Sequence, residues 1–235
     1  MKQLFMVLTA CFLLCGSVFA QESSTQSKGK ETTVEERYLE SAEVRLIREQ
    51  ALQPERDAKE KALKSLEDLI KNGKVGESDK EVHLILENLS LEGTGILIWE
   101  NRRLLNNYPD IRMKACQLLG QMGTDDAKEI LINVLLSDDE TMVLSEAVYA
   151  LGVMGKNENN QVSEAIAYTI LNQDIINPDN NFAMASLFAL EKLAAKNNGL
   201  NDPNAFRALI RISQGNYIRD VKLKADQVIE KLKKY

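Results

Sequence analysis

The sequence predicts an all-α protein built as a stack of short helical hairpins. Residues 115–123 (ACQLLGQMG) and 147–155 (AVYALGVMG) carry alanine, glycine, methionine and glycine in the same order, at an offset of 32 residues (147 minus 115). In both segments the apolar residues recur at helical spacing. A fixed period between about 20 and 50 residues is typical of stacked-repeat architectures, so we expect an α-solenoid.

Five first helices of the hairpins share one apolar pattern. Around residue 115 it consists of Ile111, Ala115, Leu118, Leu119 and Met122, which lie on one face of a helix. Apolar or small residues fill the same places in four further segments, residues 58–69, 143–154, 182–193 and 221–232.

Four second helices have their own apolar pattern. It predicts helices over residues 82–89, 127–134, 162–169 and 206–213. In the last of these, the buried face is predicted to hold Phe206, Leu209, Ile210 and Ser213.

Two glycines lie inside predicted helices, where each costs on the order of 1 kcal/mol against alanine. We expect Gly120 and Gly152 to allow a close approach between neighbouring helices. Gly123 and Gly155 are expected to end these helices.

The segment Pro109-Asp110-Ile111-Arg112, followed by Ala115 and Leu119-Gly120-Gln121-Met122-Gly123, resembles the HEAT repeat family in its short form. The resemblance covers roughly residues 55–235. It implies a right-handed α-solenoid of about four to five HEAT-like hairpins, whose second helices line the inner surface. Members of this family are mostly binding scaffolds. Leu144 stands where the second copy would carry the counterpart of Arg112, so a continuous Asp/Arg ladder is not expected.

The N-terminal 20 residues have the pattern of a secretory signal peptide, with cleavage expected after Ala20. An uncleaved anchor and lipidation at Cys11 are the alternatives considered, and both are disfavoured. Residues 21–33 are expected to be a flexible polar leader, and residues 34–53 an N-terminal capping helix. The solenoid would then occupy residues 54–235, with a non-repeat insertion at 91–108. A bacterial signal of this kind predicts a periplasmic destination.

Charge and cysteine content narrow the possible partners. The net charge of −6 does not favour nucleic acid or anionic lipid as a partner. No segment after residue 20 has the length and hydropathy of a stable membrane span. With Cys11 and Cys15 in the predicted signal peptide, Cys116 has no disulfide partner and is expected to be a small packing residue.

The insertion at 91–108 contains the only tryptophan, Trp99, followed by Arg102 and Arg103. Helical spacing would place both arginines near the indole, as a docking patch for a protein partner. The interpretation favoured from the sequence is different: the apolar residues plug a groove between repeats, and the arginines face water. These residues are Ile96, Leu97, Trp99, Leu104 and Leu105.

Other side chains give weaker functional signals. Arg207 and Arg211 are four residues apart on a second helix and could bind an acidic partner segment, although solvated charges are the simpler interpretation. Polar positions expected on the inner surface also include Lys128, Asn133, Glu164 and Asn172. His83 is the only histidine, so no triad or histidine-based metal site can form. We predict no catalytic, cofactor-binding or metal-binding residues.

The sequence therefore predicts a non-catalytic, periplasmic protein-binding scaffold or adaptor. A structural component of an envelope machine, such as a flagellar motor or secretion apparatus, is an alternative. A lyase enzyme built on HEAT-like repeats is a further and less favoured alternative. A protein partner in the cell envelope is expected, but the sequence does not identify it and does not give the oligomeric state.

Overall fold

A computed structural model describes residues 34–75 and 79–235 of the chain. The predicted signal peptide, the leader and the alternative lipidation site at Cys11 lie outside these residues. The chain divides into two units, residues 1–38 and 39–235. Helix α1 (Val34–Ala51) begins in the first unit, and the second unit contains all the remaining helices.

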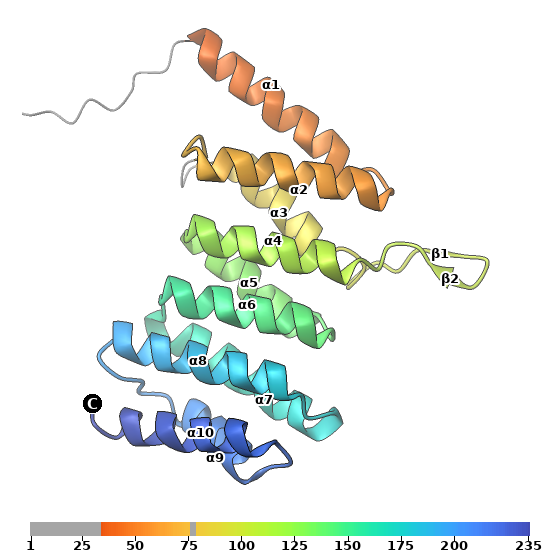
Figure 1. Ribbon diagram of the computed structural model, residues 1–235. Coiled ribbons are helices and arrows are strands. Elements are labelled where there is room, and N and C mark those ends of the chain that lie inside the picture. Colours follow the sequence, from red (N-terminus) through yellow and green to blue (C-terminus); the bar gives the residue numbers. More distant parts are fainter. Residues whose placement is uncertain (1–33, 76–78) are drawn as a thin grey trace, which may run out of the picture. The chain divides into compact units, whose positions relative to one another are not determined.

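Residues 56–232 form two layers of helices, with first and second helices alternating along the chain (Figure 1). The first helices are α2 (Arg56–Lys71), α4 (Pro109–Met122), α6 (Thr141–Met154), α8 (Asn180–Lys196) and α10 (Arg219–Leu232). The second helices are α3 (Lys80–Ser90), α5 (Asp125–Ser137), α7 (Gln161–Ile176) and α9 (Pro203–Gln214). The predicted all-α solenoid of helical hairpins is confirmed.

The core runs along the stack between the two layers. Equivalent leucines on four successive first helices are fully buried, namely Leu66, Leu119, Leu151 and Leu190. Because these leucines occupy the same buried position, the apolar pattern persists from repeat to repeat. Loop lengths can vary between repeats, since loop insertions cost little free energy. Each added hairpin buries one apolar face against the hairpin before it.

The interior glycines mark the closest contacts between first helices. A Cβ atom at Gly120 would lie 2.7 Å from the Cβ of Ala150, and one at Gly152 would lie 2.6 Å from the Cα of Ala189. Gly123 ends α4 with a φ of 65°, and Gly155 ends α6 with a φ of 70°. Both lie in the left-handed region that glycine adopts without strain, so both predicted roles of the glycines are confirmed.

The predicted register of α9 is wrong by one residue. The buried residues of this helix are Ala205, Ala208, Leu209 and Ile212. Ile210 is 47% exposed, and Phe206 and Ser213 are only partly buried. The buried face therefore carries two small alanines, and the larger Phe206 and Ile210 lie outside it.

Three short elements complete the described fold. A 3-10 turn, η1 (Glu158–Asn160), precedes α7, and strands β1 (Trp99–Glu100) and β2 (Arg103–Leu104) lie in the insertion. Among the described helices, none combines the length and hydropathy needed to cross a membrane.

Candidate functional site: a projecting hairpin

Residues 91–108 connect α3 to α4 and form a β-hairpin that projects from the stack (Figure 1). Strands β1 and β2 are antiparallel, with Trp99 opposite Leu104 and Glu100 opposite Arg103. The expectation of helical spacing between Trp99 and the two arginines is therefore wrong. The run Ile96-Leu97-Ile98-Trp99 is rich in β-branched and aromatic residues, which fit a strand better than a helix.

The tip of the hairpin is a two-residue turn at Asn101 and Arg102. Both residues have positive φ, 49° and 68°. This is the backbone conformation of a type I′ turn, whose twist matches that of the flanking strands. Asparagine adopts it readily, whereas arginine pays a steric cost there. The turn therefore holds Arg102 at the exposed tip in a strained conformation.

One buried side chain stabilises the stem of the hairpin. Asn106 donates from Nδ2 to the carbonyl oxygen of Ile96 at 2.6 Å, and its Oδ1 accepts from the backbone N–H of Ile98 at 2.9 Å. The N–H of Leu105 donates to the carbonyl oxygen of Ile98 at 2.8 Å. Because a two-stranded ribbon is marginal in water, these bonds matter more here than in a larger sheet.

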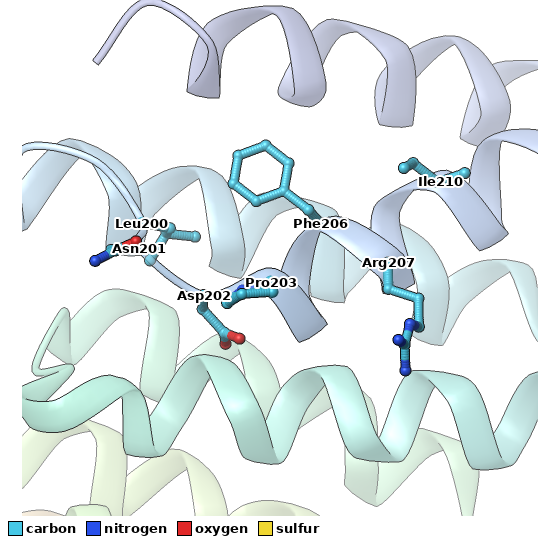
Figure 2. A pocket seen from close by; sticks show the side chains of 7 residues that line it. All are labelled: Leu200, Asn201, Asp202, Pro203, Phe206, Arg207 and Ile210. Carbon is cyan, nitrogen blue, oxygen red and sulfur yellow. The ribbon is translucent and has the colours of Figure 1, made fainter.

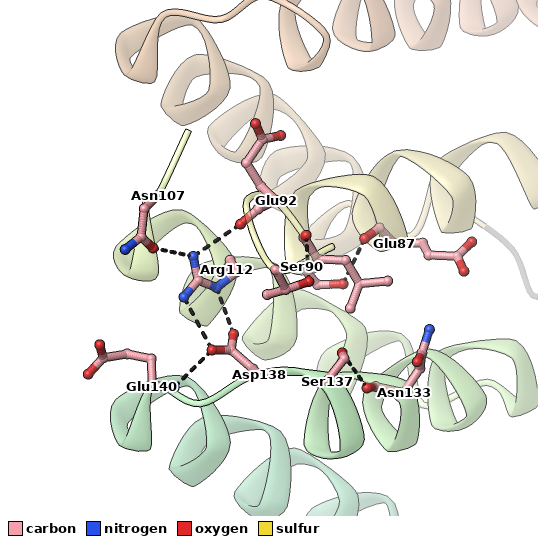
Figure 3. A network of polar contacts seen from close by, with 11 residues as sticks. Glu87, Ser90, Glu92, Asn107, Arg112, Asn133, Ser137, Asp138 and Glu140 are labelled. Carbon is pink, nitrogen blue, oxygen red and sulfur yellow. Dashed lines mark hydrogen bonds and ion pairs between the residues drawn. The ribbon is translucent and has the colours of Figure 1, made fainter. Parts of the chain in front are cut away.

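The two ends of the insertion are fixed at its base. Gly93 has a φ of 74°, and a Cβ there would lie 2.1 Å from the carbonyl oxygen of Asn106. Nη1 of Arg112, on α4, donates to the carbonyl oxygen of Glu92 at 3.0 Å and to Oδ1 of Asn107 at 2.8 Å (Figure 3). Glu92 lies near the start of the insertion and Asn107 near its end, so one guanidinium joins the two ends of the insertion.

Arg112 is itself held by a buried carboxylate. Nε donates to Oδ2 of Asp138 at 2.6 Å, and Nη2 donates to Oδ1 at 3.2 Å. Asp138 also accepts from the N–H of Glu140 at 2.9 Å, which fixes the carboxylate at the start of α6. A guanidinium that is paired with a carboxylate and hydrogen-bonded through all three of its nitrogens tolerates burial. The base of the projecting hairpin is therefore held by Arg112 on α4 and by Asp138, which lies between α5 and α6.

The apolar residues of the hairpin face solvent. Ile96 is 78% exposed, Trp99 is 61% exposed, and Leu97 and Ile98 are about half exposed. The favoured interpretation, a plug in the groove between repeats, is therefore wrong for Ile96, Leu97 and Trp99; Leu104 and Leu105 are partly buried. Consecutive strand residues point to opposite faces, so both faces of the stem are apolar. Arg102 is exposed beside them, and the side chain of Arg103 lies outside what the structure describes.

The two arginines on α9 differ in their partners. Arg211 forms an ion pair from Nε to the buried carboxylate of Asp174, so part of its charge is already compensated. Burial, followed by the nearby Asp174 carboxylate, raises the pKa of Tyr217. Arg207 is exposed and forms no ion pair with any described residue.

Two side chains from the sequence analysis have structural roles. Nδ1 of His83 donates to the carbonyl oxygen of Asp79 at 2.9 Å, and Nε2 lies 2.6 Å from Oγ1 of Thr124. Burial raises the pKa of the Cys116 thiol, which disfavours the nucleophilic thiolate.

Lys128 was expected on the inner surface, but it is buried and pairs with Glu158 at 3.1 Å. The bond reaches from α5 to the turn before α7, so Lys128 joins two repeats and is not a surface charge. No group of three potential metal ligands occurs in the described part of the chain.

These features define an α-solenoid of two-helix repeats that carries one projecting hairpin. The family model for HEAT repeats matches residues 102–168, from the hairpin tip into α7. Residues 102–168 therefore carry HEAT repeats, and repeats of this kind form helical scaffolds for protein interaction. A search of curated proteins finds no match to the chain.

Sequence reasoning missed the Arg112–Asp138 clamp, although both residues were visible in the sequence. Arg112 belongs to the Pro109-Asp110-Ile111-Arg112 segment, and Asp138 begins the acidic run Asp138-Asp139-Glu140, which the sequence alone indicates only as a set of carboxylates that complement a helix dipole. Because Leu144 stands at the equivalent position of the next repeat, the sequence shows no repeating arginine that would indicate the pair. Leu144 is fully buried, so the third repeat replaces the ion pair with an apolar contact.

Proposed function

We propose that this protein is a non-catalytic adaptor, exported to the periplasm, that binds a protein partner through the hairpin at residues 91–108. The exposed, rigidly based hairpin is the observation that carries this proposal. Soluble proteins rarely leave a contiguous run of large apolar side chains in water without a function. Trp and Arg are also the residue types most often found as energetic anchors of interfaces.

The chemistry of the hairpin favours a protein partner over a lipid layer. Insertion of the tip into a membrane would place Glu100, Asn101 and Arg102 at the greatest depth, where charged groups are costly. A protein groove with apolar walls and an acidic end would satisfy both parts of the hairpin. Its walls would cover Ile96 and Trp99, and its acidic end would pair with the arginines.

The non-catalytic part of the proposal is supported by the states of the reactive side chains. The only histidine is hydrogen-bonded through both ring nitrogens, and Cys116 is fully buried. Neither side chain is free to act as a base or a nucleophile on a bound molecule.

The test is an in-cell crosslink followed by affinity capture, comparing the wild-type protein with a Trp99→Ala/Arg102→Glu/Arg103→Glu variant. A control with the same charge change, Tyr168→Ala/Arg45→Glu/Arg219→Glu, alters exposed residues away from the hairpin. We expect one envelope protein to be captured by the wild type and the control, but not by the hairpin variant. Capture that persists in the hairpin variant would rule out the hairpin as the docking site.

Export is tested separately. Fractionation of cells should place the protein in the periplasm, and N-terminal sequencing should begin at Gln21. A chain that retains Met1, or that carries lipid on Cys11, would overturn this part of the proposal without affecting the role of the hairpin.

A further inference from the structure

The two edges of the projecting hairpin differ in their exposure. On the β1 side, every residue from Gly95 to Glu100 is exposed. Beyond β2, Leu105 is partly buried and Asn106 is buried. A Cβ at Gly93 would lie 2.1 Å from the carbonyl oxygen of Asn106, so the backbone at Gly93 lies against that residue. The open edge of the hairpin is therefore the outer edge of β1.

The inner edge of β1 has its hydrogen bonds satisfied. The carbonyl oxygen of Ile98 accepts from the N–H of Leu105. The side chain of Asn106 extends this pattern, since its Nδ2 donates to the carbonyl oxygen of Ile96 and its Oδ1 accepts from the N–H of Ile98. Asn106 therefore holds the chain before β1 alongside the second leg of the hairpin.

The outer edge of β1 carries backbone groups that are available to a second molecule. Residues of an antiparallel pair alternate between hydrogen-bonded and non-hydrogen-bonded positions. Because the adjacent pair is bonded through Leu105, Trp99 and Leu104 occupy a non-hydrogen-bonded position. The N–H and C=O of Trp99 therefore point away from β2, and those of Leu97, two residues earlier, point the same way. None of these four groups bonds to a residue that the structure describes.

The sequence of this edge lacks the usual protection against a further strand. Proteins commonly protect an exposed edge with a lysine, a proline or a bulge. Residues 95–99, Gly-Ile-Leu-Ile-Trp, contain no charged residue and no proline. An open edge rich in β-branched and aromatic residues is a template on which another strand can pair.

A second apolar surface, the groove along α9, has a different chemistry. It has a volume of about 550 Å³ and is lined by Leu200, Pro203, Phe206 and Ile210, among others. Figure 2 shows Phe206 and Ile210 projecting from the same side of α9. The backbone of α9 is hydrogen-bonded within the helix, so its exposed face offers side chains alone. The hairpin edge adds four free backbone groups to its exposed side chains, which favours a strand as its occupant.

Charge indicates one further property of that strand. Arg102 is exposed at the tip of the hairpin and forms no ion pair with a described residue. Residues 95–106 carry one acidic and two basic residues, a net charge of +1. An acidic residue of the partner beside the tip would compensate the charge of Arg102 and fix the direction of the strand.

We propose that the partner contributes an extended strand, which pairs with the outer edge of β1 and converts the hairpin into a three-stranded sheet. This proposal rests on the adaptor function, because it names the element of the partner that the hairpin binds. Leu97 and Trp99 supply the backbone hydrogen bonds. The side chains of Leu97 and Trp99 contact the new strand on one face of the sheet, and those of Ile96 and Ile98 contact it on the other. Three strands are also more stable in water than two.

The first measurement selects strands without knowledge of the partner. A library of displayed peptides of about ten residues is panned against the full protein, in the form that cells accumulate. The enriched peptides should lack proline, carry apolar residues at alternate positions and include an acidic residue. Failure to enrich such peptides would overturn the proposal.

Two substitutions of Leu97 separate backbone pairing from side-chain contact. Leu97→Pro removes an N–H that points outward and places the pyrrolidine ring on the open edge, where a proline is compatible with a strand. Leu97→Ala truncates the same side chain but keeps the N–H. The enriched peptides should bind Leu97→Pro about 30-fold more weakly than the wild type, and Leu97→Ala only about fivefold more weakly. Equal losses in the two variants would overturn strand pairing.

Hydrogen exchange reports both the fold of the variant and the mode of binding. A protected Leu105 amide verifies that the hairpin is intact in Leu97→Pro. In the wild type, a bound peptide should slow exchange of the Leu97 and Trp99 amides by about tenfold or more. The Ile98 amide, which is already bonded to Asn106, should change little. Unprotected Leu97 and Trp99 amides in the peptide complex would overturn the proposal.

Two further measurements test the other possible contacts. Ile210→Ser alters the α9 groove and leaves the hairpin unchanged, so the peptides should bind this control like the wild type. Binding lost in Ile210→Ser would place the peptides at α9 and overturn the hairpin edge as their site. Sedimentation velocity of the free protein should give a monomer. A dimer that Leu97→Pro abolishes would make a second copy the occupant of the edge and overturn the partner strand.

In-cell capture separates this proposal from the adaptor function. Capture of the partner by the wild type and Leu97→Ala, but not by Leu97→Pro, would support both. If Leu97→Pro retains the partner while the Trp99→Ala/Arg102→Glu/Arg103→Glu variant loses it, the adaptor function stands and strand pairing is overturned. If the peptides bind at the edge but no envelope protein is captured in cells, the adaptor function is overturned and the strand-binding edge stands.

Discussion

Lys59 and Arg112 both bind Glu92. Lys59 pairs with the side-chain carboxylate of Glu92, and Arg112 bonds to the backbone carbonyl oxygen of Glu92. Nζ of Lys59 lies 3.0 Å from Oε2 of Glu92 and donates to the carbonyl oxygen of Ala51 at 2.9 Å. Arg112 donates to the Glu92 carbonyl oxygen at 3.0 Å. Both cations are almost fully buried, with side chains 3% exposed.

These two cations occupy equivalent positions of successive first helices, at an offset of 53 residues. Each pairs with an acidic residue just beyond the second helix of its own hairpin, Glu92 after α3 and Asp138 after α5. The cation–acid pairs therefore occur in the two repeats that flank the projecting hairpin. We infer that they fix the direction of the hairpin as well as the contact between repeats.

The first prediction concerns Arg112→Leu. The substitution leaves the Asp138 carboxylate buried without its cation, which should lower the free energy of unfolding by about 3–5 kcal/mol. Urea unfolding at neutral pH measures this loss. Since Trp99 is the only tryptophan, its fluorescence anisotropy should also fall as the base of the hairpin loosens.

A second substitution provides the control for this effect. Arg112→Leu/Asp138→Asn removes the unpaired charge but keeps an acceptor for the N–H of Glu140. This double variant should recover part of the lost stability, as the buried Leu144 of the next repeat suggests. A single variant within about 1 kcal/mol of the wild type would show that the pair contributes little.

The second prediction concerns the close contacts between first helices. Gly120→Ala should lower the free energy of unfolding by about 1–3 kcal/mol despite alanine's higher helix propensity, because the new methyl group overlaps Ala150. Gly152→Ala should cost at least as much, because its methyl group meets the backbone of Ala189. Chemical denaturation measures both losses.

Rescue distinguishes the two sites. Ala150→Gly removes the Cβ that Gly120→Ala meets, so the double variant should regain most of the lost stability. Ala189→Gly leaves the Cα in place 2.6 Å from the new methyl group, so it should rescue Gly152→Ala only partly. Equal rescue at both sites would mean that the helices shift apart easily.

The helices could be predicted from the sequence because burial repeats with the period of the stack. All five first helices and all four second helices lie where the apolar pattern places them. The register of α9 could not be predicted in this way, because its buried face carries the small Ala205 and Ala208 while the larger Phe206 and Ile210 lie outside it. Helical periodicity alone does not distinguish two apolar faces of one helix.

The hairpin could not be predicted for two physical reasons. Its turn uses Arg102 at positive φ, whereas the usual signal for such a turn is glycine after asparagine. Its base is held by Arg112 and Asp138, which are 26 residues apart and meet only once α4 and α5 have formed their hairpin. The sequence indicated where the repeat pattern breaks, but the exposure of Trp99 depends on this tertiary arrangement.

The third prediction follows from the strained turn. Arg102→Gly creates an Asn-Gly pair and removes the steric cost of positive φ, which should stabilise the hairpin by about 1 kcal/mol. Hydrogen exchange of the Leu105 amide, which bonds to Ile98, should slow about fivefold. Asn101→Gly is the control and should slow exchange less, because asparagine tolerates this conformation. Unchanged exchange in Arg102→Gly would mean that the turn does not limit opening of the stem.

The fourth prediction concerns Glu146, a carboxyl group whose charged form is disfavoured by burial. Burial raises the pKa of Glu146 on α6, although the charge of Lys114 partly opposes this effect. A raised pKa means that the folded protein holds this proton more tightly than the unfolded chain does. Its contribution to stability is therefore present at low pH and is lost as the pH rises through the folded-state pKa.

Glu146→Gln removes the charge at every pH. The variant should unfold about 1–3 °C above the wild type at neutral pH, where ionised Glu146 destabilises the fold. The difference should disappear below about pH 4, where the carboxyl is protonated in both the folded and unfolded states. Thermal unfolding across this pH range checks the sign. A variant that unfolds below the wild type at neutral pH would mean that the charge of Glu146 stabilises the fold, through Lys114.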